Sequence, residues 1–79
     1  MTTTNLKPRN ILVNGKRSSM RLEDELWSAL TVIAKKEGKT IHGVVSFIEA
    51  HDRRGGTLTS SVRAYIVNHM LNITRKRYG

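Results

Sequence analysis

The sequence contains no cysteine, a single proline and, among 79 residues, only one tryptophan, two tyrosines and one phenylalanine. Without cysteine, neither a disulfide framework nor a thiolate metal site can stabilise the fold. The three histidines, His42, His51 and His69, are not spaced as paired metal ligands. A chain this short buries only a modest fraction of its surface, so association with a second copy is the natural way to complete a core.

Long hydrophobic runs are also missing. No apolar segment approaches the roughly 20 residues of a membrane-spanning helix, and the opening MTTTNLKPRN lacks the apolar stretch of a signal peptide. The sequence shows no glycine-rich phosphate loop, no metal-ligand set and no serine with a positioned base. We therefore expect a cytoplasmic protein that is not an enzyme, with no cofactor, no small-molecule ligand and no membrane association.

Acidic residues are scarce and unevenly distributed. Fourteen Lys and Arg residues against six Asp and Glu give a formal net charge of +8. All six acids lie between Glu23 and Asp52, so five basic residues precede them and six follow with no acid nearby. Two uncompensated basic regions are the electrostatic pattern expected of a protein that binds a polyanion.

The chain is predicted to form one domain over residues 11–73, between a flexible basic arm (1–10) and a short basic tail (74–79). Residues 16–22 suit a β-strand. A helix is predicted to begin in the acidic run 23–25, because carboxylates favour the positive end of the helix dipole. Its apolar residues recur with helical spacing on one face: Leu26, Trp27, Leu30, Ile33 and Ala34.

Two further helices are predicted after Gly38. Thr40 is a good N-cap for the second, which is expected to run to about Arg53. The third is expected to start at Thr57 or Thr59 and to end at Ile73. The predicted order is therefore arm, strand and three helices, without an internal repeat.

The predicted strand has two different faces. Side chains alternate along a strand, so Arg17, Ser19 and Arg21 share one face, opposite Ser18, Met20 and Leu22. If the strand were turned so that the opposite face packed on the core, both arginines would be buried, which is disfavoured. A lone strand needs a hydrogen-bonding partner. Two copies paired antiparallel would present four arginines on one ribbon face, and the major groove of DNA admits such a ribbon.

The segments KRSSMRLEDELW, IAKKEGKTI and GTLTSSVRAYIVNH resemble the ribbon-helix-helix DNA-binding domains of bacteria and phages, in a subfamily with a third helix. The resemblance covers roughly residues 15–70. It implies a mainly α fold with a short β-ribbon, an intertwined homodimer and paired strands in the major groove. It assigns base contacts to Arg17, Ser19 and Arg21, and phosphate contacts to Thr40, Ile41 and His42. We also predict a phosphate contact for Lys16. The residues predicted for the dimer core are Met20, Leu22, Trp27, Leu30, Val45 and Ile48.

The sequence departs from this family at two points. Ser18 occupies a position where the family usually has an apolar, inward-facing residue. Asn14-Gly15 is also a strong hairpin turn signal. If it forms a hairpin, Val13 pairs with Lys16 and Ile11 with Ser18, and the dimer ribbon widens to four strands. The alternative is that residues 1–15 form a mobile arm along the DNA backbone.

The leading functional hypothesis is a sequence-specific, DNA-binding homodimer that acts as a transcriptional repressor. Its partners would be double-stranded DNA and a second copy, with higher-order assembly on DNA left open. One alternative is an antitoxin or plasmid-transfer accessory protein that uses the same fold to dock a protein. The other is a non-specific nucleoid or RNA-binding protein.

Overall fold

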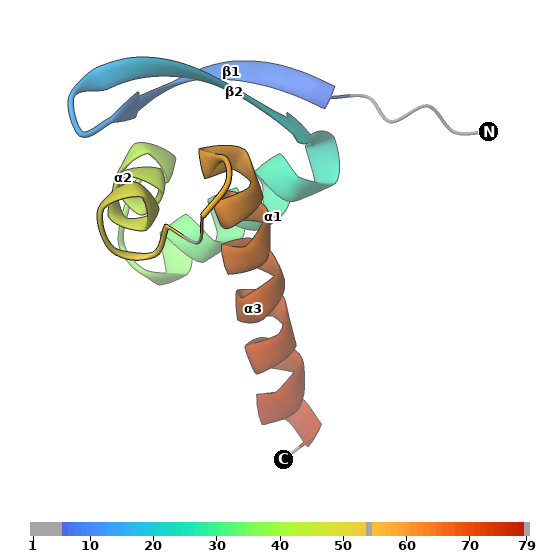
Figure 1. Cartoon of the computed structure of the whole chain (residues 1–79). Helices are drawn as coiled ribbons and strands as arrows, with labels where there is room; N and C mark the ends of the chain where they lie inside the picture. Colours follow the sequence, from blue (N-terminus) through green and yellow to red (C-terminus); the bar gives the residue numbers. More distant parts are fainter. Residues whose placement is uncertain (1–5, 54, 79) are drawn as a thin grey trace.

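A computed structural model describes residues 6–53 and 55–78, with only the backbone for residues 73–78. A β-hairpin arches over a layer of helices, and the last turns of the final helix extend away from it (Figure 1). The elements in chain order are β1 (Leu6–Val13), β2 (Lys16–Glu23), α1 (Asp24–Lys36), α2 (Ile41–His51) and α3 (Leu58–Tyr78). This two-stranded ribbon with three helices confirms the predicted mainly α fold with a short β-ribbon and an additional helix, and the intertwined homodimer stays a prediction.

The hairpin forms as one of the two alternatives predicted. Asn14 and Gly15 have φ angles of 52° and 84°, and positive φ at both central residues defines the tight turn whose twist suits two paired strands. Val13 lies opposite Lys16 and Ile11 opposite Ser18, as expected for that turn. The ribbon of a single chain therefore already has two strands.

The first strand is longer than predicted from the sequence. β1 begins at Leu6 and pairs with β2 as far as Leu6 opposite Glu23, so residues 6–10 are strand where an arm was predicted. This strand contains Pro8, and proline is unfavourable within a sheet because it cannot donate a backbone hydrogen bond. It is tolerated because β1 lies at the edge of a two-stranded sheet.

The core lies between the hairpin and the helices. The six residues predicted for a dimer core are all buried inside one chain, among them Leu22 and Leu30 at 0% exposure. α1 buries the face that its sequence periodicity indicated, and α2 buries Val44, Val45 and Ile48. The buried hydrophobic residues are Ile11, Val13, Met20, Leu22, Trp27, Leu30, Ile33, Ala34, Val44, Val45, Ile48, Val62 and Ile66. A single chain thus closes this core with its own elements.

The helix ends follow local signals closely. Gly38 has φ 68°, and its N–H donates to the Lys35 carbonyl while the Lys39 N–H donates to the Ala34 carbonyl. This pair of bonds is the Schellman arrangement that ends helices at glycine. The Thr40 hydroxyl accepts a hydrogen bond from the Gly43 N–H at 3.0 Å, as expected of an N-cap.

The remaining helix boundaries differ from prediction by a few residues. α2 ends at His51, before the expected Arg53. α3 begins at Leu58 and its backbone stays helical to Tyr78, through the segment predicted as a tail. No helix breaker occurs between Leu58 and Tyr78, so the backbone has no local reason to leave the helix at Ile73.

Candidate nucleic-acid interface

The outward face of β2 carries the three residues predicted to contact bases. Arg17, Ser19 and Arg21 are all exposed, while Met20 and Leu22 between and beside them are buried at 4% and 0% exposure. The buried face fixes the parity of the strand, because a slip of one residue would exchange the two faces. Two guanidinium groups and a hydroxyl therefore point away from the core on a strand that the core supports.

β1 adds side chains to the same face that were not predicted from the sequence. Cross-strand neighbours share a face, and the register places Asn10 opposite Ser19 and Leu12 opposite Arg17. Both Asn10 and Leu12 are exposed. The Asn14-Gly15 turn could have identified these residues from the sequence. A two-residue turn sets the register of the hairpin, and the register determines which β1 residues share a face with Arg17 and Ser19.

Two side chains of α2 hold the outer edge of β1 near the turn. The Leu12 N–H donates to Nδ1 of His42 at 3.0 Å. The Asn14 N–H donates to Oγ of Ser46 at 2.9 Å, and that hydroxyl donates to the Leu12 carbonyl at 3.3 Å. His42 and Ser46 are four residues apart and thus share one side of the helix. This end of the hairpin is fastened to α2.

Trp27 of α1 holds the other end of β1. Its indole Nε1–H donates to the Lys7 carbonyl at 2.9 Å, and the Arg9 guanidinium lies 4.9 Å from the ring centroid. Trp27 itself is 2% exposed, so the contact is made by a side chain fixed in the core. Because both ends of β1 are attached to helices, the hairpin is positioned as a unit on the helical layer.

The N-terminus of α2 is the predicted phosphate-binding site, and the structure places it beside the ribbon. His42 lines a shallow hollow together with Asn10, Leu12 and Arg17. The N–H groups of Gly43 and Val44 already bond to Thr40. The amides of Ile41 and His42 have no partner within the described residues, as first-turn amides of a helix do. The His42 ring accepts at Nδ1, so its neutral form carries hydrogen on Nε2.

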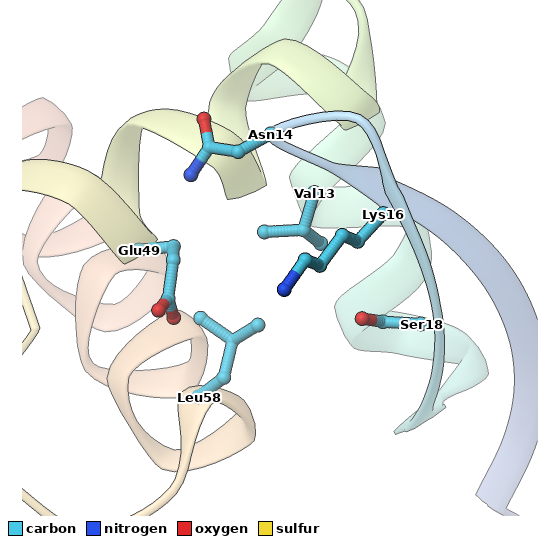
Figure 2. A pocket seen from close by; sticks show the side chains of 6 residues that line it. All are labelled: Val13, Asn14, Lys16, Ser18, Glu49 and Leu58. Carbon is cyan, nitrogen blue, oxygen red and sulfur yellow. The ribbon is translucent and has the colours of Figure 1, made fainter.

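Lys16 is not brought together with the other predicted phosphate contacts. Its cross-strand neighbour is the buried Val13, which puts Lys16 on the inner face of the hairpin. Figure 2 shows its side chain extending into a hollow under the turn, toward Glu49 and Leu58. Alternation along the strand explains the difference, because Lys16 and Arg17 must point to opposite faces.

The acid of the ribbon, Glu23, lies at its far end and is neutralised there. Glu23 lies opposite Leu6, and its carboxylate pairs with the Arg63 guanidinium of α3 at 2.8 Å. A backbone hydrogen bond within Glu23, followed by the hydrogen bond and charge of Arg63, keeps the pKa of the Glu23 carboxyl below its ordinary value. The outward face therefore carries no unpaired negative charge among residues 6–23.

Other functional sites are not indicated in the part of the chain that the structure describes. There, no group of three or more His, Asp or Glu side chains is arranged to hold a metal ion. Within the same residues, no helix combines the length and apolar character needed to cross a membrane. The exposed face of the hairpin, with the adjoining start of α2, remains the candidate site.

Comparisons with known proteins agree with this fold. An uncharacterized protein from Bordetella pertussis Tohama I has a solved structure that matches this one with a TM-score of 0.75 at 19% identity. The match covers 94% of this chain and 62% of that chain, so the present chain spans less than two thirds of its length. A search of curated proteins gave no significant match. The model of the ribbon-helix-helix domain matches residues 6–70, and the chain therefore belongs to the ribbon-helix-helix domain family.

Proposed function

We propose that this protein is a sequence-specific DNA-binding regulator that reads the major groove with the outward face of its β-ribbon and acts as a transcriptional repressor. One observation carries the proposal. Arg17, Ser19 and Arg21 are exposed on a strand whose opposite face is buried, so the core presents them as a rigid set. Arginine pairs with guanine O6 and N7 in the major groove, and serine bonds to several bases.

Affinity in this proposal comes mainly from phosphate contacts. The chain has a formal net charge of +8, and each phosphate neutralised releases counterions, so binding weakens steeply as salt rises. We assign phosphate contacts to the free amides of Ile41 and His42 at the start of α2, where the helix dipole favours an anion. The His42 Nε2–H adds a donor at the same place.

We also propose that the protein acts as a homodimer, as the family resemblance implies, and at the nucleoid in the cytoplasm. The single chain already buries the six residues assigned to a dimer core. The dimer in this proposal is the intertwined homodimer that the resemblance implies. It doubles the net charge facing the DNA and so strengthens binding to phosphates.

The test is a titration of labelled duplexes, including the DNA upstream of the gene, against random duplex at two salt concentrations. We expect a preference of at least about a thousandfold for one site. The mass of the complex, measured alongside, reports whether two chains bind. Arg17→Ala and Arg21→Ala are each expected to weaken binding to the preferred site by about 1–3 kcal/mol, with a smaller effect on random DNA.

Lys35→Ala is the matched control, because it removes one exposed positive charge from the last turn of α1, outside the ribbon. It should weaken binding to the preferred duplex and to random duplex equally, and only slightly. Equal losses on both duplexes for Arg17→Ala would contradict base reading and favour a non-specific nucleoid role. Absence of any DNA binding would favour a protein-docking role such as that of an antitoxin.

A further inference from the structure

α3 carries a second apolar stripe on the side opposite the core. Its inner side buries Val62 and Ile66. The residues of its outer side follow one another at spacings of four, three and four positions, and we call them the outer stripe: Ser60, Ala64, Val67 and Leu71. This spacing keeps side chains on one side of a helix and is the seam spacing of a two-stranded coiled coil.

The outer stripe is largely exposed in a single chain. Val67 is 52% exposed and Leu71 is 48% exposed, while Ala64 is half-buried. Single apolar residues scattered over a surface need no explanation. Apolar residues that recur at seam spacing do, because only a second surface laid along the helix would remove them together from water.

We propose that a second copy of the chain covers the outer stripe, so that the two α3 helices of the homodimer pack in parallel along this seam. This inference rests on the homodimer of the proposed function. It adds to the ribbon a second dimer contact, which lies away from the DNA-reading face.

The charge on α3 favours a second copy as the occupant. Arg63 is the only Lys or Arg in the segment 58–72, which also contains no acid. Its guanidinium is already paired with Glu23 of the same chain at 2.8 Å. The outer stripe itself carries no charged residue. A neutral surface can approach its own copy without repulsion and offers nothing to attract an acidic partner or DNA.

α3 also lies toward the edge of the hairpin where a second ribbon can join. The outer edge of β1 is bonded to His42 and Ser46 of α2 and is interrupted by Pro8. Among the described residues, β2 has a neighbouring strand on one edge only. α2 packs against β1, whereas α3 contacts β2. A copy joined at the open edge of β2 therefore brings its own α3 toward the outer stripe.

The contacts of α3 with β2 place the start of the helix beneath the middle of the strand. Leu58 lines the hollow that Ser18 also lines, and Arg63 pairs with Glu23. These contacts lie on either side of Ser19, the central one of the three outward residues of β2. In a ribbon of two joined β2 strands that presents these residues symmetrically, the two-fold axis passes beside Ser19.

The separations of joined strands and packed helices are compatible with this position. Two paired strands lie about 4.8 Å apart, so each lies about 2.4 Å from the two-fold axis. Two packed helices lie about 8–10 Å apart, so each lies about 4–5 Å from the same axis. A helix beneath β2 or slightly inside it is therefore at the distance that helix pairing requires.

The direction of α3 gives the orientation of the pair. Figure 1 shows α3 running from beneath the hairpin away from it, so an axis perpendicular to the joined ribbon runs alongside the helix. Two helices related by such an axis are parallel, and each residue of the outer stripe faces its own counterpart. In the sequence, Thr74 and Tyr78 continue the same spacing.

The experiment uses single cysteines in the full chain, which has no cysteine of its own. Val67→Cys and Leu71→Cys place a thiol on the outer stripe. Asn68→Cys is the matched control, because Asn68 is exposed on the same helix but lies outside the stripe. A disulfide requires Cα atoms about 4.4–6.8 Å apart. After mild oxidation, we expect most of the two stripe variants, and little of the control, to be disulfide-linked dimer.

A second pair of variants measures the contact without oxidation. Leu71→Glu should raise the dissociation constant of the dimer at least about thirtyfold, because two leucines leave the seam and two like charges replace them. Asn68→Glu makes the same change of charge outside the seam and should alter the constant less than about fivefold. Sedimentation equilibrium measures both, and circular dichroism reports whether each variant keeps its helices.

Two results would overturn the inference. If a dimer forms but the three cysteines cross-link equally slowly and Leu71→Glu dissociates it no more than Asn68→Glu, the outer stripe does not join two copies. The proposed homodimer would then stand on its ribbon alone, and the stripe would be left to a different protein partner. A chain that is monomeric both in solution and on its preferred duplex would overturn the homodimer together with this inference, while base reading would still be tested by Arg17→Ala.

Discussion

The two faces of the hairpin are built for different tasks. The inner face carries Met20 and Leu22 at 4% and 0% exposure, packed on the helices. The outer face carries Arg17, Ser19 and Arg21, exposed and without hydrogen-bond partners among the described residues. Under the proposed function, adjacent residues of one strand therefore contribute either to stability or to DNA recognition, according to the face on which they lie. The comparison predicts that substitutions one position apart have opposite effects on folding and on DNA binding.

Leu22→Ala is expected to have the largest effect on stability. Removing a fully buried leucine leaves a cavity and lowers the free energy of unfolding by about 2–5 kcal/mol. Arg21→Ala, the neighbouring outer residue, should change it by less than about 0.5 kcal/mol. Urea denaturation measures both. A similar loss of stability for the two variants would mean that the parity of β2 differs from that described.

Periodicity explains why this part of the fold could be predicted from the sequence. The order of apolar and polar residues in β2, α1 and α2 admits one solution that buries Leu22 and Trp27 and exposes the arginines. Thr40 and Gly38 marked helix ends through their own local chemistry. The outward position of Arg17, Ser19 and Arg21 followed from alternation alone.

Other features could not be predicted, because they depend on contacts distant in sequence. Residues 6–10 are polar and contain Pro8, so only their pairing with β2 and the attachment to Trp27 make them a strand. His42 was predicted as a phosphate contact, but its bond to Leu12 spans 30 positions in the chain. The sequence also cannot distinguish a core closed by one chain from a core shared by two, because both bury the same apolar residues.

Ser46→Ala tests whether the attachment of β1 to α2 supports the outer face. The substitution removes the bonds to the Asn14 N–H and the Leu12 carbonyl. Because these groups are exposed and water can replace the hydroxyl, we expect a loss of about 0.5–1.5 kcal/mol in unfolding free energy. Ser28→Ala, on the exposed side of α1, is the control for the change in helix propensity. If hydrogen exchange at the Leu12 and Asn14 amides were equally slow in both variants, the attachment would have no role in holding the hairpin.

Ser18→Val is expected to stabilise the protein modestly. Ser18 occupies an inner-face position and lines the hollow under the turn with Val13, Lys16 and Leu58 (Figure 2). Valine would fill part of this space, and each buried methylene contributes about 0.8 kcal/mol. We expect a gain of roughly 0.5–1 kcal/mol because the position is half-buried. Ser19→Val, on the outer face, is the control because it brings the same gain in strand propensity without filling the hollow. The difference between the urea midpoints of the two variants therefore measures the effect of filling the hollow.

Tyr65 of α3 is expected to make the smallest contribution to stability, and alkaline solution should remove it. Its hydroxyl donates to the Glu37 carboxylate at 3.1 Å, and burial, followed by the hydrogen bond and charge of Glu37, raises its pKa from 10.0 to about 12. A raised pKa favours the protonated form in the folded state, so this stabilisation is complete below pH 10 and disappears as the pH rises through about 12. Thermal melting of the full chain and of Tyr65→Phe should therefore converge between these two pH values. Parallel curves across that range would show that the Tyr65 hydroxyl does not link α3 to the end of α1, and that α3 is held by Val62 and Ile66 in the core.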